Sequence, residues 1–187
     1  MRVISGIYKG RRLKTVEGQS VRPTSDRLRE TLFNVLKGSV EGAKFVDLCA
    51  GSGAVGIEAL SRGAAHVTFV ESARRAAAII NENLAHCKIE DHFRVINRDA
   101  VSVLRYFASY HLQYDIFYFD PPYDSDLYTP VMQTLAKSRI VAEAGIVIVE
   151  HRRKFPLSPN YESLRPYREI NQGDTTLTFY SMERGIA

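Results

Sequence analysis

The chain has 187 residues, of which 45% are hydrophobic and 25% charged, and its formal net charge is +4. This length and composition fit one globular domain with a substantial core and exclude a disordered or fibrous chain. No apolar run approaches the roughly 20 residues that span a bilayer, and the basic N-terminus lacks the apolar core of a signal peptide. Two cysteines without CxxC spacing favour reduced thiols in the cytoplasm, and the scattered histidines predict no metal site.

The N-terminal segment concentrates basic residues and predicts a small appendage. Residues 3–17 are expected to form two short strands around a Lys9-Gly10 turn. Thr24 or Ser25 should then cap a helix that runs to about residue 36, with its leucines on one apolar face. A basic segment on a nearly neutral body is typical of a contact with a polyanion, although a solvated charged surface explains the cluster equally well.

From residue 45 onward, predicted strands and helices alternate. The strands are expected at 45–48, 66–70, 93–97, 114–119 and 145–150, and the helices at 53–62, 73–87, 100–110 and 127–138. Two further strands, at 161–167 and 175–181, are joined by the turn residues 171–174 and predict an antiparallel hairpin. The expected fold is α/β, with a seven-stranded, mostly parallel sheet. The expected division is a basic extension over 1–37 and an α/β domain over 38–187.

A glycine-rich turn follows the first strand of this domain and predicts a ligand site. Gly51 and Gly53 let the backbone turn sharply and approach a ligand, and the following helix directs its N-terminus at that ligand. Together with Gly56, these glycines also satisfy the dinucleotide fingerprint GxGxxG, so by themselves they leave an NAD-dependent dehydrogenase open. A tight strand-helix turn without any ligand is the other alternative.

Acidic residues at the ends of neighbouring strands decide between these alternatives. Asp47 ends the first strand, where its carboxylate would meet a cationic amino-acid group, and Glu71 ends the second, where it would accept both ribose hydroxyls. Asp99 follows the third strand and would accept a hydrogen bond from an adenine amino group or cap the next helix. The candidate cofactor-binding residues are Asp47, Ala50, Gly51, Ser52, Gly53, Glu71, Asp99 and Ala100.

The apolar strand at 114–119 leads directly into the tetrapeptide Asp120, Pro121, Pro122 and Tyr123, which is the candidate catalytic site. The two prolines stiffen the loop and remove two backbone donors, which leaves a cluster of acceptors. Such a cluster suits an aromatic amine, whose N–H groups would donate to Asp120 and to the carbonyl of Pro121. The ring of Tyr123 would stack on the target base. A surface turn is the alternative reading for this tetrapeptide out of context.

These motifs, in this order, resemble those of the class I S-adenosylmethionine (SAM)-dependent methyltransferases that methylate amino groups. The N-terminal MRVISGIYKGRRL, the stretch RPTSDRLRETLFN and the stretch DLCAGSGAVGIEALSRGA resemble the RsmD family over essentially the whole chain. The resemblance implies SAM as methyl donor, S-adenosylhomocysteine (SAH) as product, and a monomeric enzyme. It also implies that the substrate is guanine N2 in 16S rRNA of an assembled or partly assembled small ribosomal subunit. Tyr123 stands where phenylalanine is frequent, and its hydroxyl would add a donor near the target base.

The basic extension would then hold the RNA, while the pocket around Tyr123 selects a base that has left its stack. The candidate RNA contacts are Lys9, Arg11, Arg12, Lys14, Arg22, Arg27 and Arg29. A DNA amino-methyltransferase shares the catalytic motif, but it usually carries a target-recognition domain for which 187 residues leave no room. A non-catalytic RNA-binding assembly factor is a further alternative, which the intact acidic and aromatic site disfavours. A dehydrogenase leaves the catalytic tetrapeptide unexplained, and a small-molecule methyltransferase leaves the basic extension without a role.

Overall fold

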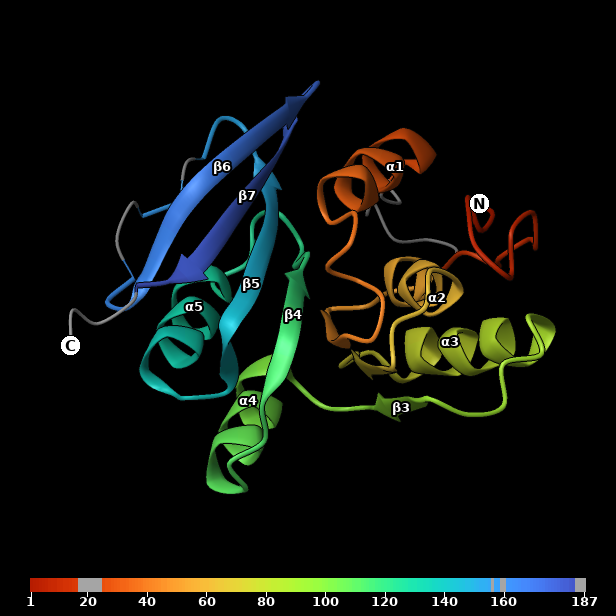
Figure 1. The fold of residues 1–187 in the computed structure, drawn as a ribbon, viewed down its shortest axis with the longest axis horizontal. Coiled ribbons are helices and arrows are strands. Elements are labelled where there is room, and N and C mark those ends of the chain that lie inside the picture. Colours follow the sequence, from red (N-terminus) through yellow and green to blue (C-terminus); the bar gives the residue numbers. More distant parts are fainter. Residues whose placement is uncertain (17–24, 156, 159–160, 184–187) are drawn as a thin grey trace. The chain divides into compact units, whose positions relative to one another are not determined.

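The computed structural model describes residues 1–16, 25–155, 157–158 and 161–183, and it divides the chain into two compact units (Figure 1). The first unit covers Met1–Asp99 and the second Ala100–Ala187. In the described part of the chain, no helix combines the length and the apolar character needed to cross a membrane. The predicted boundary between an extension at 1–37 and a domain at 38–187 stays a prediction.

Among the residues that the structure describes, the first unit contains three helices and a parallel sheet. Its elements are α1 (Asp26–Val35), β1 (Lys44–Leu48), α2 (Ala54–Ser61), β2 (His66–Val70), α3 (Arg74–His86) and β3 (Phe93–Ile96). The strands are paired in the order β3-β2-β1, as the predicted alternation of strands and helices requires. Ser25 caps α1 as expected, because its hydroxyl accepts a hydrogen bond from the Leu28 N–H at 3.1 Å. Helix α2 packs against β1 and β2, and all eight of its residues are buried.

The N-terminal segment doubles back as predicted, but its two expected strands do not form. Only an isolated antiparallel bridge joins Arg2 and Arg12. The reason is tertiary: the N–H groups of Ile4 and Ser5 donate to the buried carboxylate of Glu58 on α2, at 2.7 and 3.0 Å, instead of to a partner strand. The segment therefore lies beside α2 as a docked loop (Figure 1).

The described part of the second unit contains two helices and a mixed sheet. Its elements are α4 (Ala100–Ser109), β4 (Tyr114–Phe119), α5 (Tyr128–Lys137), β5 (Val141–Arg152), β6 (Leu164–Gln172) and β7 (Thr175–Met182). Their order is β4-β5-β7-β6, with β4 and β5 parallel and the remaining neighbours antiparallel. Helices α4 and α5 pack against each other. The C-terminal antiparallel strands expected from the sequence are therefore present.

Strands β5 and β6 differ most from the prediction, whereas the bounds of the other strands agree to within one residue. Strand β5 begins at Val141 rather than at residue 145, because Val141 already pairs with Tyr114 before a register shift in that ladder. Strand β6 begins at Leu164 rather than at residue 161 and continues to Gln172. The polar residues near its end resemble a turn in sequence, yet they pair with β7, and only Gly173, at φ +61°, and Asp174 remain as the turn.

Candidate active site

The turn between β1 and α2 has the backbone geometry that a ligand-binding loop requires. Gly51 and Gly53 lie in the left-handed region, at φ +56° and +76°, and a Cβ atom on Gly51 would meet nothing within 4 Å. A hydrogen bond fastens the loop to β2, because Ala50 donates its N–H to the carbonyl of Val70 at 3.0 Å. Gly56 matters for packing, because a Cβ atom at this position would lie 2.2 Å from the ring of Phe69. A glycine there lets α2 pack closely on β2.

Asp47 lies near the end of β1, just before this loop, and only 2% of its surface is exposed. Its carboxylate accepts a hydrogen bond from the Gly56 N–H at 2.9 Å, which satisfies a free donor in the first turn of α2. Burial raises the pKa of Asp47 to about 8; the Gly56 hydrogen bond opposes this rise, and the charge of Glu71 adds to it. One carboxylate oxygen therefore supports the loop, and the predicted contact with a cationic amino-acid group stays a prediction.

Glu71 connects the ends of β1 and β2. Its two carboxylate oxygens accept hydrogen bonds from the N–H groups of Gly51 and Ala73, both at 2.8 Å. Asn97, which the sequence analysis did not single out, donates from its side chain to the carbonyls of Glu71 and Ser72 at 2.8 and 2.9 Å. Glu71 therefore joins the glycine loop to the end of β2, and its predicted contact with a ribose stays a prediction.

The remaining predicted cofactor residues belong to the first unit, except Ala100, with which the second unit begins. Asp99 is exposed just after β3, and Ala100 opens α4. Ser52 contributes its backbone carbonyl, which accepts a hydrogen bond from the side chain of Asn83 at 2.9 Å. Asn83 also exchanges hydrogen bonds with the backbone of Lys14, at 2.8 and 3.0 Å, and is 1% exposed. Asn83 thus fastens the N-terminal segment to the glycine loop, and its only sequence signal is a polar residue on the buried face of α3.

In the second unit, the catalytic tetrapeptide directly follows the buried strand β4. The last four residues of β4 are buried, Asp120 is partly exposed, and Pro121 is buried. The carbonyl of Pro122 accepts the Ser125 N–H at 2.9 Å, which closes the loop into a turn. The turn and the two prolines restrict the backbone that follows the partly exposed Asp120.

Tyr123 is fixed by contacts that the sequence analysis missed. Its hydroxyl lies 2.9 Å from the Thr175 hydroxyl and 3.5 Å from a carboxylate oxygen of Glu150, rather than pointing to solvent as a free donor. The Arg152 guanidinium lies 5.1 Å from the centre of the Tyr123 ring. Glu150 is 2% exposed and also accepts a hydrogen bond from the Tyr118 hydroxyl. Burial raises the pKa of Tyr123, so its hydroxyl stays protonated at neutral pH.

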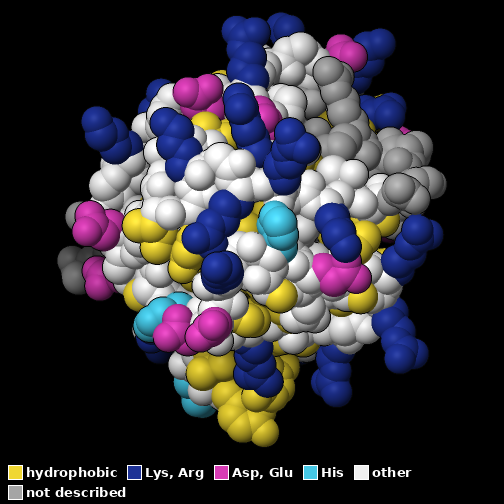
Figure 2. Space-filling model, turned by 90° about the vertical axis from the view of Figure 1, so that its right-hand side faces the viewer, with side chains coloured by type: hydrophobic (Ala, Val, Ile, Leu, Met, Phe, Trp, Pro, Cys, Tyr) yellow, Lys and Arg dark blue, Asp and Glu magenta, His cyan; other side chains and the backbone are white. Residues whose placement is uncertain are grey.

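The predicted RNA contacts in the first unit differ in their surroundings. Lys9, Arg12 and Arg27 are exposed, whereas Arg11 is half-buried, with its guanidinium 4.8 Å from the Tyr8 ring centre. Lys14 is exposed and forms an ion pair with Glu82 at 2.8 Å. Figure 2 shows Lys and Arg side chains spread, with acidic ones among them, over the face on which the N-terminus and α3 lie in Figure 1.

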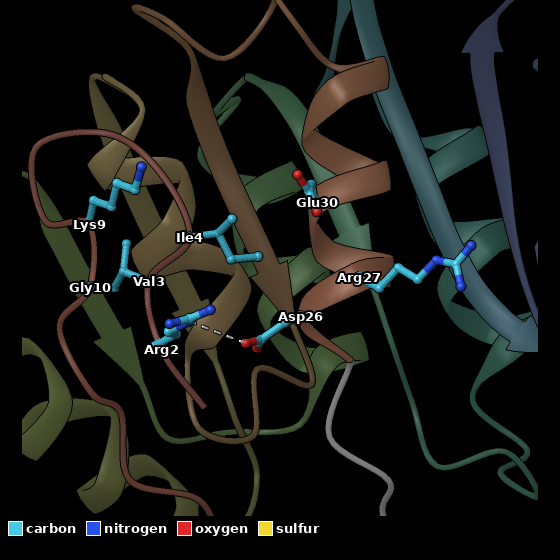
Figure 3. A pocket seen from close by; sticks show the side chains of 8 residues that line it. All are labelled: Arg2, Val3, Ile4, Lys9, Gly10, Asp26, Arg27 and Glu30. Atoms are coloured by element: carbon cyan, nitrogen blue, oxygen red, sulfur yellow. Dashed lines mark ion pairs between the residues drawn. The ribbon is translucent and has the colours of Figure 1, made fainter.

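Figure 3 shows a cavity of about 270 Å³ between the N-terminal segment and α1. Arg2 and Asp26 point toward each other across it, 3.8 Å apart, whereas Arg27 extends away from them. Arg29 corrects the sequence analysis: it is fully buried and donates to the Arg2 carbonyl and to Asp26, so it anchors the N-terminal segment and does not meet RNA. Arg22, the remaining predicted contact, lies outside the described residues.

Solved structures place this geometry in a known class. The structure of yhhF from Escherichia coli matches with a TM-score of 0.84 at 33% identity, and the match covers 98% of each chain. A SAM-dependent methyltransferase from Agrobacterium tumefaciens shares the fold with a TM-score of 0.64 at 17% identity, over 83% of this chain and 61% of that one. The chain has the α/β fold of the class I methyltransferases, with seven strands among its described residues.

The family follows from the sequence comparisons. The chain belongs to the family described as "Conserved hypothetical protein 95", whose model matches residues 1–181 and which is the RsmD family. "Ribosomal RNA small subunit methyltransferase D" of Escherichia coli K12 is 35% identical over 185 residues, covering 98% of this chain and 90% of the relative. The protein of the same name from Haemophilus influenzae is 32% identical over 158 residues, covering 84% and 81%. The resemblance to the RsmD family is thereby confirmed.

Proposed function

We propose that this protein transfers a methyl group from SAM to the exocyclic N2 of a guanine in 16S rRNA, in an assembled or assembling small ribosomal subunit. The observation that carries the proposal is the acceptor site at the end of β4, Asp120 followed by two prolines and a tyrosine, in a chain 35% identical to a protein named as a small-subunit rRNA methyltransferase. The product of the donor is SAH.

The residues of the first unit fit the donor. Glu71 carries a negative charge at the end of β2, where it is suited to accept ribose hydroxyls, and the side of Gly51 that a Cβ would occupy is open. The open side of Gly51 would let a ligand approach the backbone close to the start of α2. The left-handed conformation of Gly53 serves the turn itself, because a Cβ there would meet the side chains of Ile80 and Phe69. SAM supplies an electrophilic methyl group on a sulfonium. The proposed holders in the first unit are Asp47, Ala50, Gly51, Ser52, Gly53, Glu71 and Asp99, and Ala100 of the second unit is proposed to join them.

The residues of the second unit fit the acceptor. The Asp120 carboxylate and the Pro121 carbonyl would each accept one N–H of the target amine, which favours a pyramidal nitrogen and directs its lone pair at the methyl carbon. Accepting the methyl group would make the amine nitrogen cationic, and the adjacent Asp120 carboxylate would stabilise this charge. One N–H proton would then have to leave the nitrogen to give the neutral methylated amine, with SAH as the other product. Tyr123, held through its hydroxyl by Thr175, would offer its ring to the base.

An RNA substrate accounts for the basic N-terminal segment. Lys9, Arg12 and Arg27 are exposed on the first unit and suited to contact phosphates, and Arg11, Lys14 and Arg22 are the further candidates. Residues 1–37 would then act as the RNA-contacting extension of a methyltransferase domain over 38–187. Phosphate contacts position an enzyme on its substrate, and the pocket that receives the base selects it.

The test is incubation with radiolabelled SAM and four substrates: undermethylated small subunits, free ribosomal RNA, DNA and a protein extract. Nucleoside analysis of the labelled material should identify N2-methylguanosine, from the small subunits. Label in adenine, cytosine or DNA would retain the amine chemistry and reject the substrate. The absence of label in every sample would favour the non-catalytic assembly factor.

A further inference from the structure

A second cavity, of about 300 Å³, lies beside the catalytic tetrapeptide within the second unit. Its walls come from the loop after β4, the start of α5, and the end of β5 with the segment that follows. Four aromatic residues line it: Tyr123, Tyr128, Phe155 and Tyr161. Tyr123 is the only one of them that the proposed methyl transfer uses, so the other three rings require another explanation.

The rings differ in burial in a way that leaves one of them accessible. Tyr161 is 6% exposed and packs edge-on against Tyr180, with ring centres 6.0 Å apart. Tyr128 packs on Phe119 and donates its hydroxyl to the Glu150 carbonyl at 3.3 Å. Phe155, in contrast, is 57% exposed at the rim of the cavity. An accessible ring over an aromatic-lined cavity suits a planar aromatic ligand.

Positive charge adjoins these rings. Arg152, Arg153 and Lys154 are consecutive and exposed, and they directly precede Phe155. Arg152 lies 5.1 Å from the Tyr123 ring centre, at the boundary between the catalytic loop and the cavity. Aromatic rings beside exposed cations are typical of surfaces that bind single-stranded nucleic acid, because the rings stack on bases and the cations contact phosphates.

Hydrogen bonds anchor the part of this loop that covers residues 151–155. His151 Nδ1 lies 3.1 Å from the Arg152 carbonyl and 3.2 Å from the Phe155 carbonyl, and its Nε2 lies 2.8 Å from the Thr178 hydroxyl. Carbonyls only accept, so Nδ1 donates and Nε2 accepts from the hydroxyl; burial lowers the pKa of His151, which keeps this neutral form. The Arg153 N–H donates to the Asp174 carbonyl at 2.8 Å. Binding therefore needs little ordering of the loop.

We propose that this cavity binds the base of a nucleotide next to the methylated one in the same strand, with Phe155 stacked on the base and Arg153 and Lys154 near its phosphates. The volume, at the low end for ligand pockets, fits one base and not a duplex, so the strand is single at this point. The proposal rests on the proposed function, because Tyr123 borders both sites. It adds a specificity site to the enzyme: the neighbouring base contributes to the choice of substrate.

The direct test uses the fluorescence of 2-aminopurine, which is quenched when the base stacks. The intact protein, saturated with SAH so that its donor site is occupied, is titrated with 2-aminopurine riboside 5′-monophosphate and with a trinucleotide RNA that carries this base at one end. We expect quenching by the intact protein and an affinity about fivefold or more lower in Phe155→Ala. Phe155→Trp should keep the affinity, and Tyr110→Ala, which removes a 64% exposed ring on another surface, should leave it unchanged.

Two results would overturn the proposal: no quenching by the intact protein, or equal quenching by Phe155→Ala and the intact protein. A transfer assay separates this failure from that of the proposed function. If RNA is methylated and Phe155→Ala has an unchanged KM for RNA, the methyltransferase stands and the cavity has another use. If no RNA is methylated but quenching depends on Phe155, the cavity binds a nucleotide and the proposed reaction fails.

Discussion

The carboxylate of Asp47 accepts a hydrogen bond at 2.9 Å from the N–H of Gly56, so a residue at the end of β1 caps α2 from below the glycine loop. No side chain at the N-cap itself does so, because that position is Gly53, in the left-handed conformation. The loop can therefore remain free of side chains, and an acid from the sheet satisfies the helix. This arrangement buries the acid and so makes the stability of the protein depend on pH.

The stability of the protein should fall as pH rises from about 4 to about 8, because Asp47 ionises in the unfolded chain before it ionises in the folded protein. Burial raises its pKa from 3.8 to about 8, so between these pH values the folded state binds a proton that the unfolded chain releases. Its contribution to stability is therefore greatest below pH 4 and is lost as pH rises to about 8. The free energy of unfolding, measured with denaturant, should fall between pH 5 and pH 8 by roughly 2 to 4 kcal/mol more in the wild type than in Asp47→Asn. Parallel pH profiles for the two proteins would contradict this assignment.

Glu71→Gln should weaken SAM binding about tenfold or more. The two oxygens of Glu71 accept the N–H groups of Gly51 and Ala73, and a glutamine would turn a donor toward one of them and remove the charge that suits ribose hydroxyls. Calorimetric titration with SAM measures the change. The control is Glu82→Gln, since Glu82 is exposed and paired with Lys14, and the SAM affinity of this variant should equal that of the wild type.

Asp120→Ala should lower kcat by about 100-fold or more while the dissociation constant of SAM stays unchanged. The reason is that Asp120 is proposed to act on the target amine and not on the donor. Single-turnover methyl transfer and SAM titration measure the two quantities. Asp124→Ala, an exposed acid in the same loop, is the matched control. If SAM affinity fell in Asp120→Ala, Asp120 would belong to the donor site instead.

Glu58→Gln should release the N-terminal segment. The buried carboxylate of Glu58 accepts the N–H groups of Ile4 and Ser5 and the Nε–H of Arg62 at 2.7 Å, and a glutamine can serve only some of these donors. We expect a loss of about 1 to 3 kcal/mol in stability and faster hydrogen exchange at Ile4 and Ser5. Glu41→Gln, at an exposed site, should change neither. Unchanged exchange at both amides would show that Glu58 does not hold the segment.

Charge reversal on the exposed part of the N-terminal segment should weaken RNA binding. The pair Lys9→Glu and Arg12→Glu removes two exposed cations without touching the hydrogen bonds to α2. We expect the slope of log affinity against log salt concentration to fall by about 0.7 to 0.9 for each phosphate that is no longer neutralised. Filter binding at several salt concentrations measures it, with Arg139→Glu as the control on the second unit. An unchanged slope would remove the segment from the proposed RNA surface.

Much of the local structure was predictable from the sequence, because it depends on neighbours within a few positions. The helix cap at Ser25, the limits of β2 and β4, and the turn at Gly51 and Gly53 all follow from periodicity, capping and glycine chemistry. Neighbouring parallel strands also end at the same edge of a sheet, which is why Asp47 and Glu71 were expected at adjacent strand ends.

Only the tertiary structure determined which polar side chains face inward. Charge alone made Arg29 a candidate RNA contact, yet its fully buried guanidinium reaches the Arg2 carbonyl, 27 positions away. Asn83 connects Lys14 to the glycine loop over 69 positions. Glu150 joins Tyr118 and Tyr123 from another strand. A buried polar group must find a partner, and which partner it finds depends on the packing of distant elements, which periodicity and motif spacing do not encode.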